Sequence, residues 1–218
     1  MSDDINWPEK GNKAFVPVRH GAYFHMPSVL AFNPVHVRAF KAAAEIILDK
    51  CEADGDMPSN DKFVFPVLYL YRHGIELNLK AIIRVGIGLE FFKKEDVAKD
   101  LERHNLANLW NHAKKLLLDH WSEDDPGPVH ATDSIINELH ESDPDGQKFR
   151  YESAKGGKLN KYEKLPDRIS VINLKKTMDG VFHFLGATCA GLEEHLQTVY
   201  KMRAEMEEEF RGQDRPEG

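Results

Sequence analysis

Apolar residues recur every three or four positions along most of this chain, which is the spacing that places side chains on one face of an α-helix. The segments 33–53, 105–121 and 173–210 follow this pattern, and the densely apolar segment 65–85 is too long for a strand. A shorter helix is expected around 134–140. The pattern predicts an all-α fold, a helical bundle of about five helices with a loop or hairpin insertion before the last helix.

Caps and turn-forming residues divide the chain into a helical domain with appendages. Asn33 is a candidate N-cap, and Pro34 suits the first position of a helix. We expect an irregular N-terminal arm over 1–33, one helical domain over 34–212 and a disordered tail over 213–218. An insertion is expected at about 143–172, where adjacent glycines at 156 and 157 favour a tight turn.

The composition is that of an ordinary globular protein. The chain has 218 residues, of which 41% are hydrophobic and 30% are charged. No apolar run approaches the roughly 18 to 20 residues of a membrane span, and the first residues lack the pattern of a secretory signal. Cys51 and Cys189 lie far apart, which argues against a disulfide framework. These features predict a cytoplasmic protein with no membrane association.

Charge is distributed unevenly along the chain, although the net charge is −7. The segment 122–145 holds eight acidic residues and no Lys or Arg, whereas 148–176 holds nine basic residues and three acidic ones. A basic segment on an acidic protein can bind a polyanion, or it can be a solvated loop. Arg150, Tyr151 and Lys155 lie in it, and aromatic rings interleaved with cations suit single-stranded RNA.

One stretch of the second helix, YLYRHGIELNLKAII, carries ionisable groups among its apolar residues. Helical geometry places the four of them on one face, next to an apolar face: Arg72, His73, Glu76 and Lys80. The stripe can be a solvent-facing edge held by pairs four residues apart. Alternatively, it is a polar pocket or interface in which Glu76 holds Arg72 and His73, since Arg binds phosphate and His moves protons near neutral pH.

Motifs of several other chemistries are missing from the sequence. There is no HExxH, CxxC, Walker-type or GxSxG pattern, and the glycines of VGIGLEFF lack the third one of a dinucleotide-binding loop. We therefore expect neither a metal site nor a cofactor.

Three segments in a fixed order, YLYRHGIELNLKAII, HNLANLW and DPDGQKFRY, resemble the HEPN superfamily of helical bundles, particularly its stand-alone prokaryotic members. The resemblance covers about 33–196. It implies a homodimer that acts on RNA in a bacterial defence or toxin-type system, and many such proteins are metal-independent ribonucleases. The catalytic candidates are then Arg72, His73 and Glu76, and the RNA- or ligand-binding candidates are Lys80, His104, Arg150, Tyr151 and Lys155.

The chain departs from the family's usual signature, an Arg and a His four to six residues apart in a later helix. The last helix has no Arg before either His, and the matching spacing occurs instead in RHGAYFH, where Arg19 and His25 form a second candidate pair. The alternatives are a catalytically inactive nucleotide- or protein-binding dimerisation module, or a structural subunit. The structural subunit would dock a partner protein, for example one from the same operon, through the acidic segment 122–145.

Overall fold

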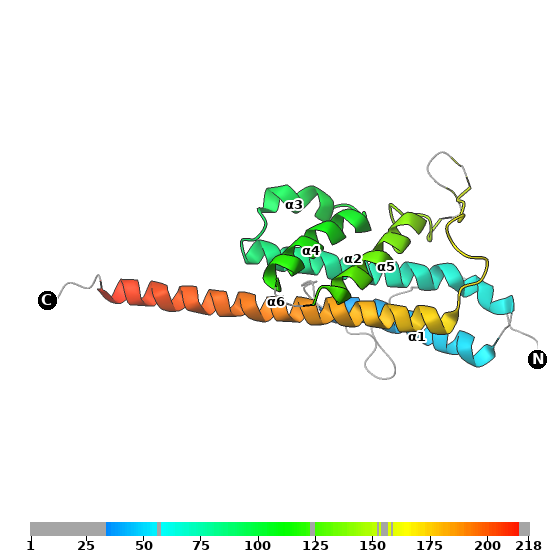
Figure 1. Cartoon of the computed structure of the whole chain (residues 1–218), viewed down its shortest axis with the longest axis horizontal. Helices are drawn as coiled ribbons and strands as arrows, with labels where there is room; N and C mark the ends of the chain where they lie inside the picture. Colours follow the sequence, from blue (N-terminus) through cyan, green and yellow to red (C-terminus); the bar gives the residue numbers. More distant parts are fainter. Residues whose placement is uncertain are drawn as a thin grey trace, which may run out of the picture. The chain divides into compact units, whose positions relative to one another are not determined.

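The computed structural model describes residues 34–55, 58–122, 125–151, 153, 157 and 159–213, which all belong to the compact unit Phe32–Gly218. These residues form six α-helices and one 3-10 helix, η1 (Figure 1). In chain order the elements are α1 (Pro34–Asp54), η1 (Pro58–Phe63), α2 (Val64–Gly88), α3 (Lys94–Leu101), α4 (Leu106–His120), α5 (Gly127–Ser142) and α6 (Val171–Gln213). The expected all-α bundle with a loop region before a long final helix is confirmed.

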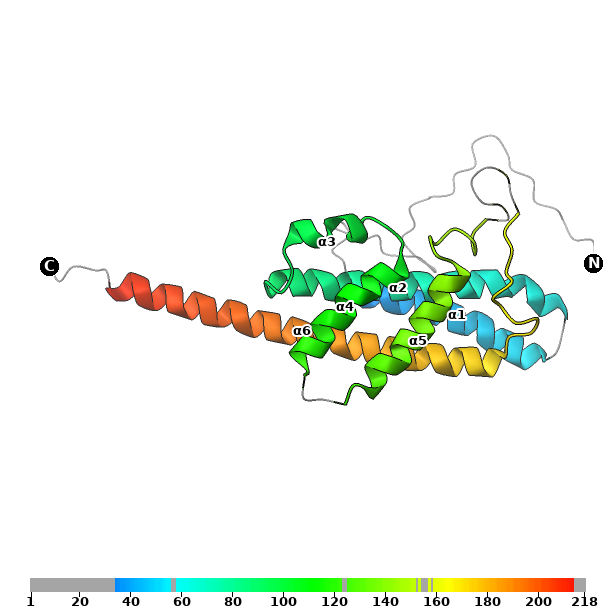
Figure 2. The same cartoon turned by 45° about the horizontal axis from the view of Figure 1, so that its top comes forward.

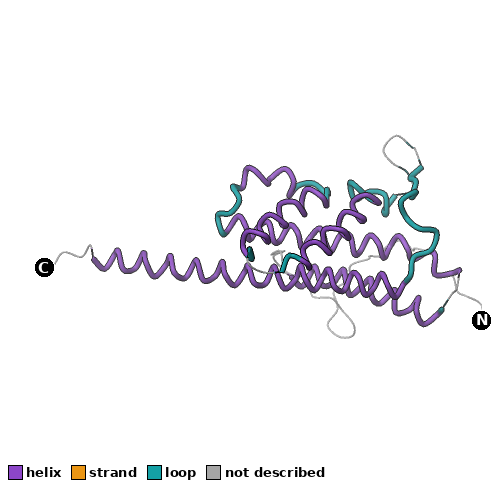
Figure 3. Tube along the Cα trace, viewed as in Figure 1, coloured by secondary structure: helices purple, strands orange, loops and turns teal. Residues whose placement is uncertain are grey.

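Within the described part of the chain there is no strand, and the β-type contact is an isolated bridge between Ser153 and Leu159 in the loop before α6 (Figure 3). No described helix combines the length with the apolar composition that crossing a membrane requires. The arm 1–33 and the tail beyond Gln213 lie outside the described residues.

Helix α2 is the centre of the bundle. It contacts α1 and α6 on one side and α4 on the other, and its two ends meet η1 and α3 (Figure 2). Helix α5 packs against α4. A helix with neighbours on opposite sides must be apolar around most of its circumference, which explains the dense apolar sequence of this segment.

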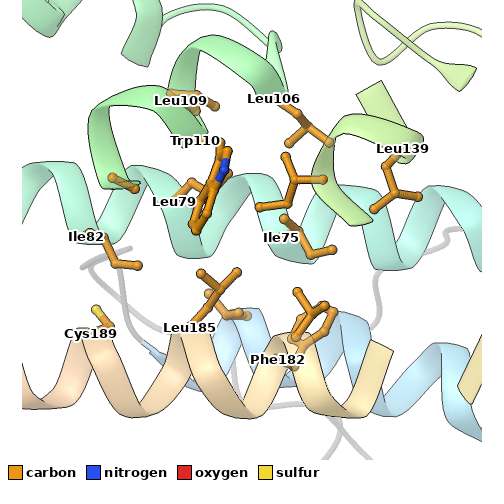
Figure 4. Close-up of a cluster of buried hydrophobic side chains, with 14 of the residues drawn as sticks. Ile75, Leu79, Ile82, Leu106, Leu109, Trp110, Leu139, Phe182, Leu185 and Cys189 are labelled. Carbon is orange, nitrogen blue, oxygen red and sulfur yellow. The ribbon is translucent and has the colours of Figure 1, made fainter. Parts of the chain in front are cut away.

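The core lies on both sides of α2. Figure 4 shows Ile75, Leu79 and Ile82 of α2 between residues of α4 and α5 above and residues of α6 below. All three side chains are fully buried, and so is Trp110 of α4. Its indole nitrogen still has a partner, because Nε1 donates to Asp133 Oδ1 at 2.6 Å. Apolar packing therefore fixes the position of α2, from which the polar stripe projects.

Local signals position the ends of several helices. Asn105 caps α4 by accepting a hydrogen bond from the backbone N–H of Asn108 at 2.9 Å. The hydroxyl of Ser170 accepts one from the backbone N–H of Asn173 at the start of α6. Pro66 lies in the first turn of α2, where a backbone N–H would have no partner within the helix.

Two helices differ from the sequence-based expectation. Helix α3 was not expected, because it has eight residues and Val97 is its one buried side chain. Helix α5 begins at Gly127 rather than near 134, and it has 16 residues. The Pro and Gly at its start indicate a loop by composition, but Pro128 lies in the first turn, where a proline is tolerated.

The loop between α5 and α6 is held to the bundle by aromatic side chains. Phe149 is buried, and its ring stacks with that of Phe65 at a centroid distance of 6.4 Å. The ring of Tyr162 packs on Phe65 at 4.6 Å, and its hydroxyl donates to the carbonyl of Lys148 at 2.6 Å. This packing holds the DPDGQKFRY segment against α2.

Candidate functional site

The polar stripe of α2 is buried. Arg72 and Glu76 are each 2% exposed, and Lys80 is 7% exposed. The interpretation of this stripe as a solvent-facing edge is therefore wrong. Buried ionised groups need partners, because transfer of an unpaired charge out of water is very costly, and the partners here come from two loops as well as from α2.

The Glu76 carboxylate is the centre of this cluster. Its Oε1 accepts hydrogen bonds from Lys80 Nζ and from His104 Nδ1, both at 2.8 Å. Its Oε2 accepts from Arg72 Nη1 at 3.3 Å. Burial by itself raises the pKa of Glu76, but the hydrogen bonds and positive charges of Lys80 and His104 outweigh burial and lower it. The carboxylate is therefore ionised at neutral pH.

Arg72 connects α2 to the loop before α4 and to the loop after α5. Its Nη2 donates to the backbone carbonyl of His104 at 2.6 Å, and its Nε donates to the backbone carbonyl of Asp143 at 3.1 Å. Asp143, which follows α5, is fully buried and brings its carboxylate to 3.3 Å from Nε. Burial lowers the pKa of Arg72, while the charges of Asp143 and Glu76 oppose this shift. All three guanidinium nitrogens thus contact protein groups, which is the arrangement of a positioning residue.

His104 differs from its partners because its side chain is 47% exposed. It lies directly before the N-cap of α4, so the helix start fixes its backbone. The ionised Glu76 can only accept, so Nδ1 is the donor in their contact and Nε2 is the acceptor nitrogen of the neutral ring. A buried carboxylate that orients a half-exposed imidazole is the arrangement used for proton transfer in many enzymes.

His73 lies on the same helix but does not bind Glu76. Its ring packs edge-on against Phe40 at 4.6 Å and stacks with Tyr69 at 5.6 Å, and among the described residues it makes no hydrogen bond. Burial lowers the pKa of His73; the charge of Glu76 opposes this, and the positive charges of His104, Lys80 and Arg150 add to it. Glu76 was predicted to hold His73, but in the structure Glu76 contacts His104 instead.

The loop after α5 brings Arg150 to this region. The centre of its guanidinium lies 5.6 Å from the ring of Tyr69 and 5.4 Å from that of Tyr151, and Nε donates to the carbonyl of Gly146 at 2.8 Å. Tyr151 is 54% exposed. The remaining predicted candidates, Arg19, His25 and Lys155, lie outside the described residues.

The sequence-based candidates did not include Asp143 and Gly146. Asp143 belongs to the acidic segment 122–145, and its complete burial removes it from the docking surface suggested for that segment. Gly146 has φ of +73°, and a Cβ there would lie 2.8 Å from Arg72 Nη1. The turn-forming sequence DPDG was an available signal for the positive φ of Gly146, whereas no local pattern indicated that Asp143 meets Arg72.

No group of three or more His, Cys, Asp or Glu among the described residues is placed to hold a metal ion. Comparison of the chain with family models, with curated proteins and with solved structures found no match.

Proposed function

We propose that this protein is an RNA-directed, metal-independent endoribonuclease with His104 as its proton-transferring residue. The observation that supports the proposal is the contact between the buried, ionised carboxylate of Glu76 and the half-exposed ring of His104 at 2.8 Å. The resemblance to HEPN proteins supports RNA as the substrate and a bacterial defence or toxin-type system as the setting. Arg72 and Glu76, first predicted to be catalytic, become positioning residues.

In this proposal His104 Nε2 takes the proton of a ribose 2′-OH. The 2′-oxygen forms a bond to the adjacent phosphorus, and the bond from phosphorus to the 5′-oxygen breaks. Water protonates the leaving oxygen, so the products are a 2′,3′-cyclic phosphate and a 5′-hydroxyl. Arg150, an exposed cation whose guanidinium lies 5.6 Å from the ring of Tyr69 on α2, would bind the phosphate. Tyr151, exposed beside it, offers a face on which a base can stack.

The test is incubation of the purified protein with labelled transfer RNA and total RNA, with and without EDTA. We expect cleavage that survives EDTA and falls at least about a hundredfold in His104→Ala, because general acid–base catalysis contributes this much. His112→Ala is the matched control, since His112 also contacts a carboxylate, Asp100, at 2.9 Å but lies farther along α4.

Each other result has a distinct meaning. Cleavage that EDTA abolishes, or that His104→Ala leaves unchanged, contradicts the proposed mechanism. Loss in His73→Ala with full activity in His104→Ala moves the proton transfer to His73. Loss in Arg19→Ala moves the site to the N-terminal arm. Circular dichroism of each variant separates a lost group from a lost fold.

A binding module without catalysis is the second candidate function, and a specific feature favours it. A cavity of about 700 Å³ lies between α1, η1, α2 and the loop before α6, and its lining includes Arg168 and Asp167. This volume is within the range of ligand-binding pockets. If no RNA is cleaved, the midpoint of thermal unfolding should rise on addition of a nucleotide. An Arg168→Ala variant should lose that increase.

A further inference from the structure

Helix α6 carries a heptad repeat along almost its whole length. Positions spaced alternately by three and four residues are apolar with one exception, Arg203. The two sets of positions are Phe182, Cys189, Leu196, Arg203 and Phe210 at a, and Met178, Leu185, Leu192, Val199 and Met206 at d. Apolar heptads sustained over this length are the pattern of a helix that pairs with other helices along one seam.

The two ends of this seam differ in exposure. From Met178 to Leu192 the seam residues are buried against the bundle, because this part of α6 contacts α1 and α2. From residue 200 to residue 210 every side chain is exposed, including Met206 at 51% and Phe210 at 70%. Figure 1 shows this end of α6 running past the other described helices. The apolar seam of α6 therefore continues beyond the point where the other described helices end.

We propose that the segment 196–213 of α6 pairs with the same segment of a second copy of this chain as an antiparallel two-stranded coiled coil. A second copy presents a seam of the same period, so the apolar positions Val199, Met206 and Phe210 fall in the seam of both copies. Pairing of position a with d across the two-fold axis places Val199 opposite Phe210 and Arg203 opposite Met206.

The charge pattern selects the antiparallel orientation. Lys201 and Arg203 precede four acidic residues, Glu205, Glu207, Glu208 and Glu209. Lys201, Glu205 and Glu208 lie at the outer f and c positions of the heptad, so the deciding charge is Arg203 at a, with Glu207 at e and Glu209 at g beside the seam. Two parallel copies would bring Arg203 against its own counterpart. Antiparallel copies place it opposite Met206 and beside the glutamates that flank the seam of the other copy, which is favourable and sets the orientation. Arg203 has a contact in its own chain, with Glu90 at 2.8 Å, but both side chains are largely exposed, so this ion pair is weak and exchangeable.

The first experiment measures the mass of the full chain in solution by analytical ultracentrifugation over a range of concentrations. We expect the mass to double as concentration rises. Met206→Glu with Phe210→Glu should abolish this association, because it places charges in the seam. Ile172→Glu is the control, since Ile172 is 65% exposed on the same helix but lies outside the seam. A monomer at every concentration, or equal loss of association in the control, contradicts the proposal.

Orientation is tested with a variant of inverted polarity, in which Lys201 and Arg203 become Glu and Glu207, Glu208 and Glu209 become Lys. Antiparallel pairing predicts that this variant associates with itself and not with the unmodified chain, because mixed pairs bring like charges together. Parallel pairing predicts the opposite, a preference for mixed pairs, and this result would overturn the antiparallel arrangement.

Discussion

The carboxylate of Glu76 shows how one side chain determines the state of its neighbours. It accepts from Lys80, His104 and Arg72, and it is the acidic group on α2 that compensates two buried cations. Loss of one partner of a buried ion pair leaves the other charge without compensation, which is strongly destabilising. Removal of Glu76 therefore affects both the fold and the orientation of His104.

Glu76→Ala should lower the free energy of unfolding by about 3–5 kcal/mol, because it leaves Lys80 buried without a carboxylate and removes one of the two carboxylates that contact Arg72. Glu45→Ala is the control: Glu45 pairs with Lys41 four residues away, but its side chain is 25% exposed, so the expected loss is under about 1 kcal/mol. Urea unfolding at neutral pH measures both losses. Equal losses would mean that the Glu76 cluster contributes no more than a surface pair.

The lowered pKa of His73 predicts that the free energy of unfolding depends on pH. Burial, reinforced by nearby cations, holds its pKa in the folded chain below the ordinary value of 6.5. As pH falls below 6.5, the unfolded chain binds this proton first, so the folded state loses stability until pH reaches the folded pKa. Above pH 6.5 the neutral ring contributes no pH dependence.

His73→Phe keeps the ring contacts with Phe40 and Tyr69 and removes the titration. The difference in unfolding free energy between the variant and the unmodified chain should therefore shift in favour of the variant as pH falls from about 7.5 to 5, because only the unmodified chain must protonate a buried ring. Other histidines cancel in this difference. A constant difference would show that the pKa of His73 is not lowered by folding.

The loop between α5 and α6 depends on its glycines in two distinct ways. Gly146 and Gly157 both have positive φ, +73° and +78°. A Cβ at Gly157 meets nothing within 4 Å, whereas one at Gly146 meets the Arg72 guanidinium at 2.8 Å. Arg72 cannot move away without leaving Glu76, His104 and Asp143, so the loop and α2 are fitted to each other at this glycine.

Gly146→Ala should lower the free energy of unfolding by about 3 kcal/mol, the sum of left-handed backbone strain and of displaced Arg72 contacts. Gly157→Ala introduces the strain alone and should cost about 1 kcal/mol. Thermal or urea unfolding of the two variants provides the comparison. If Gly146→Ala costs no more than Gly157→Ala, the Arg72 cluster tolerates displacement.

The bundle as an assembly explains why a polar cluster can lie inside it. Apolar packing of α2 against α4, α5 and α6 holds the helix in place, as Figure 4 shows. The loops before α4 and after α5 then close over one part of α2, where they supply His104 and Asp143. The long α6 contributes core residues over its first half and an exposed seam over its second. The candidate site and the proposed pairing segment thus use different parts of the same bundle.

Helix formation was predictable because it depends on local properties. The apolar period of α2, α4 and α6 and the position of Pro34 involve residues a few positions apart. The ionisable stripe was also predictable, because helical geometry alone places Arg72, Glu76 and Lys80 on one face. Helix α3 was missed because a short polar helix has too few apolar positions to show a period.

Only the tertiary structure decided what this stripe contacts. Arg72 meets the carbonyl of Asp143 across 71 positions and the carbonyl of His104 across 32. Such contacts depend on how α4 and α5 pack around α2, and no local pattern encodes them. The same packing buried Glu76, turned His73 toward Phe40 and Tyr69, and made His104 the exposed partner. A sequence pattern places side chains on a helix face, whereas the neighbouring elements determine whether that face meets water, a carboxylate or another ring.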